Sequence, residues 1–312
     1  LEASIYPAPR CETYHGVGHK SKKEGARLFS KITSCLFALS LALSLTTNAH
    51  PQFHDSTLVT GFSKGFAITA EELGLESASK NPATLTSVQK NSFSSTYSSY
   101  YNHILQSYNL SWAIPLFKRY IIGLQFPNQV VQNIPHTQAG PENEAIQIGQ
   151  FQDKKTGTAL SVAFKGSQSL SLGATLSGTH QKIFNQTQSS FGLDLGLLRK
   201  QNWGNIGISI QNMGSKRLIN NAGFTLLTPP YGHISIDASQ QKKEHLVNIG
   251  YTLPILSNFI VSAGIKDITH SKQLRLGLEL RLANVAILIA QGHHDVLGPI
   301  NKVGITFQPD SL

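Results

Sequence analysis

The sequence is short of charged residues, which make up only 14% of its 312 positions, against roughly 25% in ordinary soluble domains. A disordered chain would be richer in charge and poorer in aromatic residues. A coiled coil would need many more Glu, Lys and Arg residues. Long apolar runs are also missing: the main one, Ile32–Leu45, spans fourteen residues, fewer than the about 20 that a membrane-spanning helix requires. Disorder, a coiled coil and a helical membrane protein are therefore excluded.

The first 49 residues have the layout of a secretory signal that is preceded by an extension, residues 1–18. The apolar run Ile32–Leu45 follows a basic region and precedes small residues that end at Ala49. Signal peptides combine these three parts, so we expect cleavage after Ala49. The remaining chain contains no cysteine and so needs no disulfide. Its mild positive charge, without a basic cluster, does not favour a nucleic-acid partner.

Apolar and polar residues alternate through most of the chain after residue 91. Leu274, Leu276 and Leu278, for example, are separated by Arg275 and Gly277. A period of two places every second side chain on the same face of a β-strand. The pattern predicts about fourteen strands, most of them close to the about 9–11 residues that a strand needs to cross a bilayer. The predicted strands begin near residues 92, 106, 119, 145, 157, 169, 189, 204, 230, 244, 258, 272, 285 and 301.

The composition of the two strand faces indicates which face meets water. The polar face carries Ser, Thr, Asn and glycines such as Gly173, Gly207 and Gly264, rather than many Lys and Glu residues. Glycine weakens a strand on a solvated face, whereas inside a barrel it leaves room for a plug. The other face carries Leu, Ile, Val and Phe, as a lipid-facing band requires. We predict an all-β fold, a closed antiparallel transmembrane β-barrel of about fourteen strands. The alternative is a soluble protein of two packed β-sheets.

The chain is expected to have three parts. Residues 1–49 are the extension and signal peptide, and residues 91–312 form the barrel. Residues 50–90 lack the strand alternation and are too apolar for a plain linker. Because large barrels are commonly plugged, we expect this stretch to form an N-terminal plug or hatch segment.

The two longest connections between predicted strands, Pro127–Glu144 and Met213–Pro229, fall on opposite sides of the predicted barrel. Outer-membrane barrels have short turns on one side and long loops on the other. Two explanations are open: Arg217–Leu226 contains a further strand, or one of the predicted strands is false.

Two stretches resemble the long-chain fatty-acid transporter (FadL-type) family, including its PorV- and PorQ-like branch. Gly65–Leu85 (GFAITAEELGLESASKNPATL) resembles the N-terminal segment of that family. It ends in an Asn-Pro-Ala motif formed by Asn81, Pro82 and Ala83. Ile208–Gly214 (ISIQNMG), which two prolines follow, resembles an Asn-x-Gly loop of the PorV-type branch. The resemblance implies a barrel of about fourteen strands, with the N-terminal segment folded into the lumen as a hatch.

The barrel pattern and the resemblance together predict an outer-membrane protein of a Gram-negative bacterium, exported by its signal peptide. We expect it to contact outer-membrane lipid and to let a small hydrophobic solute pass. One alternative is a barrel that transports nothing and acts as a docking or secretion accessory, with a secretion-system protein as its partner. The other is the soluble secreted β-protein.

Charged residues on the polar face of the strands are the candidate site residues, since they would point into the lumen. They would either influence what passes, or pair with each other or with the hatch. These residues are Lys165, Asp194, Asp237, Lys266, Arg275, Glu279, Arg281 and Lys302.

Motifs that could carry catalysis or bind metal are weak. Gly61–Gly65 matches the G-x-S-x-G nucleophile pattern, which requires a preceding strand, and no strand pattern precedes it. His293, His294 and Asp295 are adjacent, but a metal site needs three or four convergent ligands. We expect no enzyme activity, no metal site and no cofactor.

Overall fold

A computed structural model of the chain describes residues 59–117, 119–140, 144–213, 218–242, 244–270 and 272–309. The expected signal peptide, its cleavage at Ala49 and the first part of the expected hatch lie outside these residues. Among the described residues, no helix is both long and apolar enough to span a membrane.

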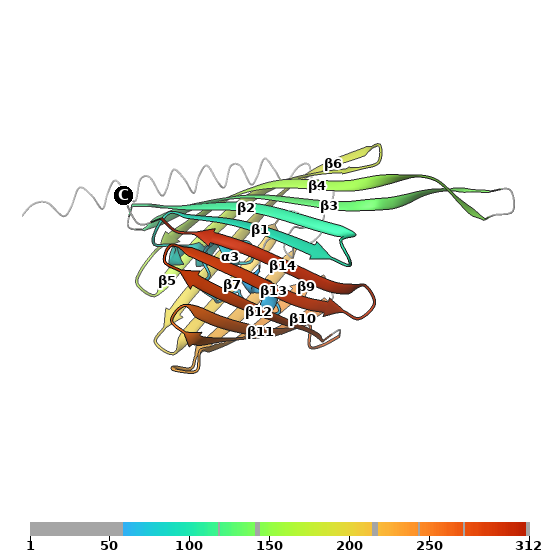
Figure 1. Cartoon of the computed structure of the whole chain (residues 1–312). Helices are drawn as coiled ribbons and strands as arrows, with labels where there is room; N and C mark the ends of the chain where they lie inside the picture. The colour runs from blue at the N-terminus through green and yellow to red at the C-terminus, as the bar shows by residue number, and fades with distance from the viewer. Residues whose placement is uncertain are drawn as a thin grey trace, which may run out of the picture. The chain divides into compact units, whose positions relative to one another are not determined.

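Fourteen strands form a single closed antiparallel barrel, in which each strand pairs with its neighbours in sequence and β1 pairs with β14 (Figure 1). The predicted barrel is therefore confirmed, and the alternative of two packed sheets is wrong. The strands are β1 (Ser92–Tyr100), β2 (Leu105–Leu116), β3 (Tyr120–Ala139), β4 (Ala145–Lys165), β5 (Leu170–Ile183), β6 (Gln186–Gln201), β7 (Gly204–Met213), β8 (Ile219–Leu227), β9 (His233–Gln241), β10 (Glu244–Leu256), β11 (Phe259–Lys266), β12 (Gln273–Leu282), β13 (Val285–His294) and β14 (Gly298–Phe307).

The two faces of the wall are oriented as the alternation predicts. In β12, Leu274 and Leu276 are 60% and 53% exposed on the outer face, whereas Arg275 between them is only 3% exposed. Inward positions of other strands carry buried Ser, Thr and Asn side chains, such as Ser107 and Asn221. The barrel thus has an apolar outer face and a polar inner face, the reverse of a water-soluble barrel.

The positions of two strands differ from the prediction. The strands expected near residues 145 and 157 are one strand, β4, whose polar centre around Lys154 interrupts the apolar alternation. The alternation did not show β8, which lies almost wholly within Arg217–Leu226. Both explanations for the two long connections are therefore correct: a strand was missing in that stretch, and one of the predicted strands was false. The expected loop Pro127–Glu144 belongs largely to β3. The two errors cancelled, which left the predicted number of strands right.

Two strands are much longer than the rest of the wall. β3 has 20 residues and β4 has 21, whereas β11 has 8 and β12 has 10. Their paired ends project beyond the neighbouring strands (Figure 1). A register shift between Val131 and Ile134, with Asn133 at a φ of 56°, marks where this hairpin leaves the barrel.

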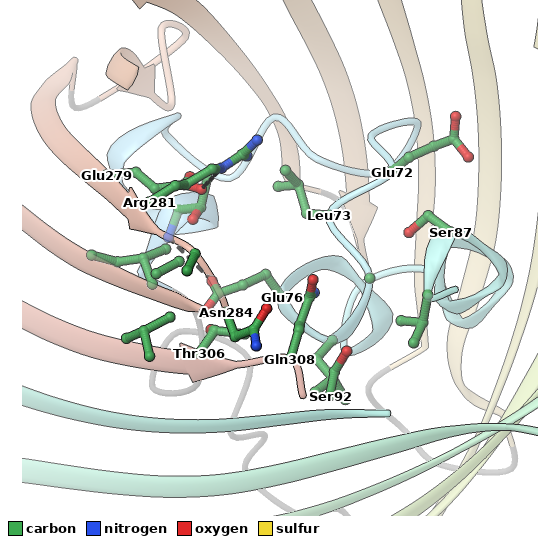
Figure 2. A pocket seen from close by; sticks show the side chains of 18 residues that line it. Glu72, Leu73, Glu76, Ser87, Ser92, Glu279, Arg281, Asn284, Thr306 and Gln308 are labelled. Carbon is green, nitrogen blue, oxygen red and sulfur yellow. Dashed lines mark hydrogen bonds and ion pairs between the residues drawn. The ribbon is translucent and has the colours of Figure 1, made fainter. Parts of the chain in front are cut away.

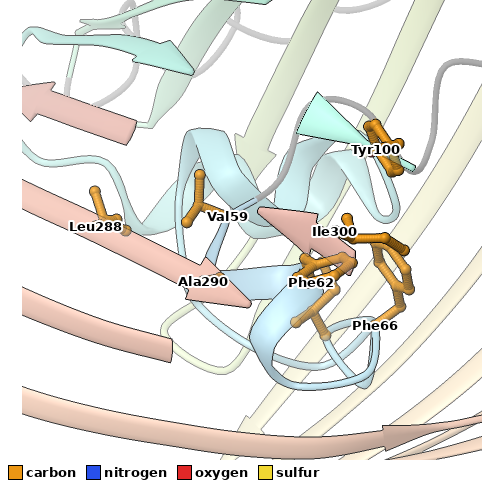
Figure 3. Packing of buried hydrophobic residues seen from close by; sticks show 8 residues of the cluster. Val59, Phe62, Phe66, Tyr100, Leu288, Ala290 and Ile300 are labelled. Atoms are coloured by element: carbon orange, nitrogen blue, oxygen red, sulfur yellow. The ribbon is translucent and has the colours of Figure 1, made fainter. Parts of the chain in front are cut away.

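Residues 59–88, which we call the inner segment, lie inside the barrel. They contain α2 (Thr60–Ser63), α3 (Leu75–Ala78) and the 3-10 helix η1 (Pro82–Ser87). α2 packs against β11–β13, whereas η1 packs against β3–β6 on the opposite wall. The inner segment therefore crosses the lumen from wall to wall. Its apolar side chains form the core with inward residues of the wall, such as Leu288 and Ile300 (Figure 3).

Candidate functional site

Asp237 on β9 is an anchor between the wall and the inner segment. Its Oδ2 accepts hydrogen bonds from the backbone N–H groups of Ile68 and Thr69, both at 2.9 Å, and from Thr69 Oγ1 at 2.6 Å. Lys80 Nζ lies 2.9 Å from the same oxygen and donates to the carbonyl of Phe66 at 2.6 Å. Asp237 is 1% exposed, so this buried charge depends on the partners that the inner segment supplies to Oδ2.

The Asn-Pro-Ala motif forms a second anchor, at the start of η1. Asn81 Oδ1 accepts a hydrogen bond from the backbone N–H of Ala83 at 3.1 Å, and Pro82 occupies the first turn of the helix. Such a proline loses no hydrogen bond, because helix N-termini leave N–H groups without partners. Asn81 Nδ2 donates to Thr69 O at 2.7 Å and to Leu197 O of β6 at 3.1 Å. The motif therefore caps a helix and also ties it to the wall.

Inward glycines let the backbone of the inner segment approach the wall. A Cβ added at Gly173 would lie 2.3 Å from the carbonyl carbon of Pro82, and one at Gly264 would lie 2.2 Å from that of Lys64. A Cβ at Gly207 would lie 2.1 Å from Thr69 O. These distances are too short for any side chain, so these wall positions require glycine while the inner segment is in place.

Cations of the wall lie over aromatic rings of the core cluster, of which Figure 3 shows Phe62, Phe66 and Tyr100. The Arg275 guanidinium lies 4.1 Å from the ring centroid of Phe62 and 4.7 Å from that of Phe66. Lys302 Nζ lies 4.9 Å from the Phe62 centroid and 5.3 Å from that of Tyr100. Lys266 Nζ lies 5.3 Å from the Phe66 ring. Cation–π contacts of this kind strengthen when they are shielded from water, as they are for Arg275 and Lys302.

A buried ion pair lies directly after α2. Lys64 Nζ pairs with Glu71, and His233 Nε2 lies 3.0 Å from that Nζ. Ser235 also donates a hydrogen bond to Glu71. Burial by itself raises the pKa of Glu71, but Lys64 and His233 outweigh it, so the pKa falls from 4.5 to about 2. Glu71 is therefore ionised at neutral pH and holds Lys64 in place.

Glu76 in α3 has the opposite balance. Burial raises its pKa from 4.5 to about 7. The backbone N–H groups of Val59 and Thr60 donate to its Oε2 at 2.9 and 3.1 Å, and they lower the pKa only in part. Two carboxyl groups of one short segment therefore have pKa values on either side of the ordinary value, because Lys64 and His233 outweigh burial at Glu71, whereas burial outweighs Lys302 and the two backbone N–H groups at Glu76.

A cavity of about 310 Å³ opens beside the inner segment, near the start of β1 and the end of β14 (Figure 2). Apolar residues such as Leu73, Val88 and Leu288 line it together with the ion pair between Glu279 and Arg281, whose Oε1 and Nε are 2.6 Å apart. A smaller cavity of about 80 Å³ shares Leu73, Glu279, Arg281 and Leu288 with it. Leu73 and the Glu279–Arg281 ion pair therefore line both cavities, along the β12–β13 wall.

The structure places the candidate charges in different surroundings. Asp237, Lys266, Arg275 and Lys302 contact the inner segment, as described above. Glu279 and Arg281 pair with each other, and the Arg281 side chain is 54% exposed. Asp194 instead supports the wall, since its Oδ1 accepts the N–H of Asn212 at 2.7 Å where the β6–β7 register shifts. Lys165 is half-buried at the end of β4.

The structure describes the residues of both weak motifs, Gly61–Gly65 and His293–Asp295. Ser63 lies in α2 rather than between a strand and a helix, and its Oγ lies 2.6 Å from Ser262 Oγ. Within the part of the chain that the structure describes, no group of three or more His, Cys, Asp or Glu residues could hold a metal ion.

Several important side chains of the inner segment were not among the sequence candidates. Phe62, Lys64, Glu71 and Lys80 all take part in the anchors and clusters described above. A signal was present: Lys64 and Lys80 are charges within an apolar stretch without strand alternation. Charged residues that are buried need a partner: Asp237 of β9 supplies it for Lys80, and Glu71 of the inner segment supplies it for Lys64.

The barrel is similar to solved structures of transport proteins. It matches the toluene transporter TbuX of Ralstonia pickettii with a TM-score of 0.66 and 11% identity, over 82% of this chain and 99% of that one. The fold is that of the FadL-type barrels. The match to a Pseudomonas aeruginosa FadL homologue has a TM-score of 0.57 and 10% identity, over 84% and 100% of the two chains. The Pseudomonas putida toluene transporter TodX gives 0.58 and 10%, over 83% and 100%.

These likenesses concern the FadL-type fold, because the sequence identities are near 10%. No family model and no curated protein matches the sequence. The PorV-type part of the resemblance stays a prediction: Ile208 lies within β7, and Gly214 lies outside the described residues.

Proposed function

We propose that the protein is an outer-membrane channel through which a small hydrophobic solute passes. The observation that carries this proposal is the orientation of the wall, with leucines exposed outside and polar and glycine residues inside. In water, an apolar face of this extent would drive aggregation. In a bilayer it is satisfied, and closure of the barrel leaves no strand edge without hydrogen bonds.

Aromatic residues support placement in a membrane. Phe93, Phe307 and Trp112 are exposed on the outer face and adjacent in the register of β14, β1 and β2, at the barrel end where β1 begins. Tyr120 and Phe164 pair across β3 and β4 at the same end. Rings gather in this way at the interface between lipid and water. Export by the signal peptide expected in residues 1–49 would bring the chain to the outer membrane of a Gram-negative bacterium.

The inner segment supports a role in gating. It crosses the lumen and its backbone touches glycines of several strands, so a solute that travels along the lumen requires it to move. We therefore propose that residues 50–90 act as the hatch. The cavity of about 310 Å³ beside it is lined by apolar side chains, such as Leu73, Val88 and Leu288, together with polar and charged ones, such as Glu279 and Arg281. A small apolar molecule would pack against the apolar part of this lining. Toluene, the solute of the transporters TbuX and TodX, is a molecule of this class.

Uptake by intact cells tests the proposal, because lipopolysaccharide slows apolar solutes more than an ordinary bilayer does. The protein would be expressed in Gram-negative cells that lack their own channel for hydrophobic solutes. We expect labelled toluene to enter these cells faster than cells that carry the empty vector. Deletion of residues 57–89 should change the uptake rate further. Heat-modifiable gel mobility would show that each barrel is closed. A closed barrel without added uptake would contradict the proposal.

The accessory role predicted as an alternative has a different outcome in the same cells. A barrel that docks a secretion-system protein would retain a stable protein partner during purification in detergent and would transport no toluene. Deletion of residues 57–89 that left uptake unchanged would contradict the gating role alone.

A further inference from the structure

Two lysines face each other on the outer side of the wall. Lys154 of β4 and Lys182 of β5 are direct partners in the antiparallel register. Both are exposed, and both share the outward parity of Leu160, which is 45% exposed. Like charges that lie directly opposite each other on neighbouring strands destabilise a sheet. The pair therefore favours a bound anion that would offset this repulsion.

The lysine pair lies at one edge of the apolar band. Phe164 and Leu172 are register partners at the opposite end of the same two strands. From that pair, ten residues along each strand (164 − 154 and 182 − 172) lead to Lys154 and Lys182. A strand crosses a bilayer in about 9–11 residues. If Phe164 and Leu172 mark one interface, Lys154 and Lys182 mark the other, on the side to which the β3–β4 hairpin projects.

Side chains around the pair are suited to an anion. His180 lies two residues before Lys182 on β5, so both side chains are on the outer face of the strand. His180 is exposed, and its Nδ1 lies 3.0 Å from Ser189 Oγ. Asp153, the carboxylate next to Lys154 in the chain, faces the other way, and Gln181 Nε2 donates to both its oxygens at 3.0 and 2.9 Å. The ion pairs of the described residues include neither lysine.

We propose that Lys154, Lys182 and His180 bind the phosphate group of a membrane lipid in the leaflet on the hairpin side. This rests on the membrane placement in the proposed function. A lipid is favoured over free phosphate because the outward pair Leu160 and Leu176 lies six residues further along the same strands, where it can contact the acyl chains. Lysine holds phosphate as a point charge, and basic sites of this kind bind lipid headgroups.

Native mass spectrometry of the detergent-purified full chain tests this site. The probes are bis-phosphorylated lipid A, its monophosphorylated form, phosphatidylcholine and inorganic phosphate. We expect the wild type to retain bis-phosphorylated lipid A best, and the double variant Lys154→Gln, Lys182→Gln to bind it on the order of tenfold less. The variant Lys154→Arg, Lys182→Arg keeps the charges and should keep the lipid.

The matched control is the double variant Lys242→Gln, Lys272→Gln, which removes two lysines from separate loops on the same side of the barrel. It should retain the lipid. Equal loss in both double variants, equal retention of phosphatidylcholine, or displacement of the lipid by inorganic phosphate at matched concentration would overturn the proposal. Heat-modifiable mobility shows that each variant is folded.

Toluene uptake separates this proposal from the proposed function. The Lys154→Gln, Lys182→Gln barrel should take up toluene as the wild type does, because both side chains lie outside the lumen. If the wild type retains lipid A but carries no toluene, only the transport proposal fails. If it carries toluene but does not distinguish the lipids, only the lipid site fails.

Discussion

The wall around the inner segment and the projecting β3–β4 hairpin share the same β pairing but differ in what their faces contact. Around the inner segment, a Cβ on Gly173 would meet the backbone of Pro82 at 2.3 Å. On the hairpin, a Cβ on Gly149 would meet nothing within 4 Å. Most side chains from Ala145 to Gln150 are exposed on both strand faces. A glycine at an inward position is therefore essential in one region and dispensable in the other.

This difference shows that alternation reports only that a strand has two unlike faces. Strand pairing satisfies the backbone in both regions. Only in the barrel does one face gain buried partners, which limits the side chains that it can carry. The following changes should separate the two regions.

The largest effect is expected from Gly173→Val. The new side chain would overlap Pro82 and Ala83, so η1 must leave the wall. We expect a marked rise in toluene uptake and faster cleavage of the inner segment by added protease. Gly149→Val is the matched control on the neighbouring strand and should change neither. If both variants had the same toluene uptake and the same rate of cleavage, glycine would not be more important in the wall around the inner segment than in the hairpin.

A large loss of stability is expected from Asp237→Asn. The change leaves the Lys80 ammonium buried without its anion, which costs about 3–5 kcal/mol in the free energy that holds the inner segment. Hydrogen exchange of residues 59–88 should rise, whereas exchange in the β3–β4 hairpin should not. The double variant Asp237→Asn, Lys80→Met removes both charges and should recover part of the loss. If the destabilisation of the double variant equalled the sum for the two single variants, Asp237 and Lys80 would not interact.

A smaller, pH-dependent effect follows from the two glutamates. The pKa of Glu71 is lower in the folded state, about 2 against 4.5, so its contribution to stability is present above pH 4.5 and disappears toward pH 2. The pKa of Glu76 is raised to about 7, so its contribution is present below pH 4.5 and disappears as the pH rises to 7. Protection of the inner segment should therefore be highest near pH 4.5.

Hydrogen exchange of residues 59–88, corrected for the intrinsic pH dependence of exchange, would measure this profile. Glu76→Gln should remove the decrease between pH 4.5 and 7 and leave the acid side unchanged. Glu71→Gln should do the reverse. A profile that neither variant alters would mean that other groups control the inner segment.

The smallest effect is expected when the hairpin is shortened. Deleting Pro135–Gln150 and joining Ile134 to Phe151 by an Asn-Gly turn keeps the register partners at the base. The deletion loses the contact of His136 with Phe184, whose ring centroids are 5.0 Å apart. Such ring contacts are worth about 0.5–1.5 kcal/mol. The unfolding midpoint in urea should therefore shift little, and loss of the closed barrel on gels would contradict this.

Much of the fold could be predicted from the sequence where one face was strongly apolar. The leucines of β12 gave a clear period of two, and their outward orientation is confirmed. β8 was missed because it mixes Asn220 and Asn221 with small residues. Asn221 is buried, and its Nδ2 donates hydrogen bonds to Ser209 Oγ at 3.1 Å and to Gln211 Oε1 at 2.9 Å. Polar residues that are buried through partners on another strand leave no hydrophobic pattern.

The candidate site was less predictable, because its partners are distant in sequence. Asp237 was a candidate through its inward parity, but its contact with Lys80 joins residues more than 150 positions apart. The inner segment has too little regular structure for its contacts to be inferred from periodicity. Glu71 and Glu76, only five positions apart, titrate in opposite directions because one lies beside Lys64 and the other does not.

The amino-acid sequence alone determined that the chain forms strands with one apolar face and one glycine-rich face, since side-chain alternation is a local property of extended backbone. Barrel closure, the path of residues 59–88 across the lumen, and the partners of the inward charges were decided only by the tertiary structure. The physical reason is that these features depend on which distant groups come within hydrogen-bonding or van der Waals distance, and local periodicity carries no information about that.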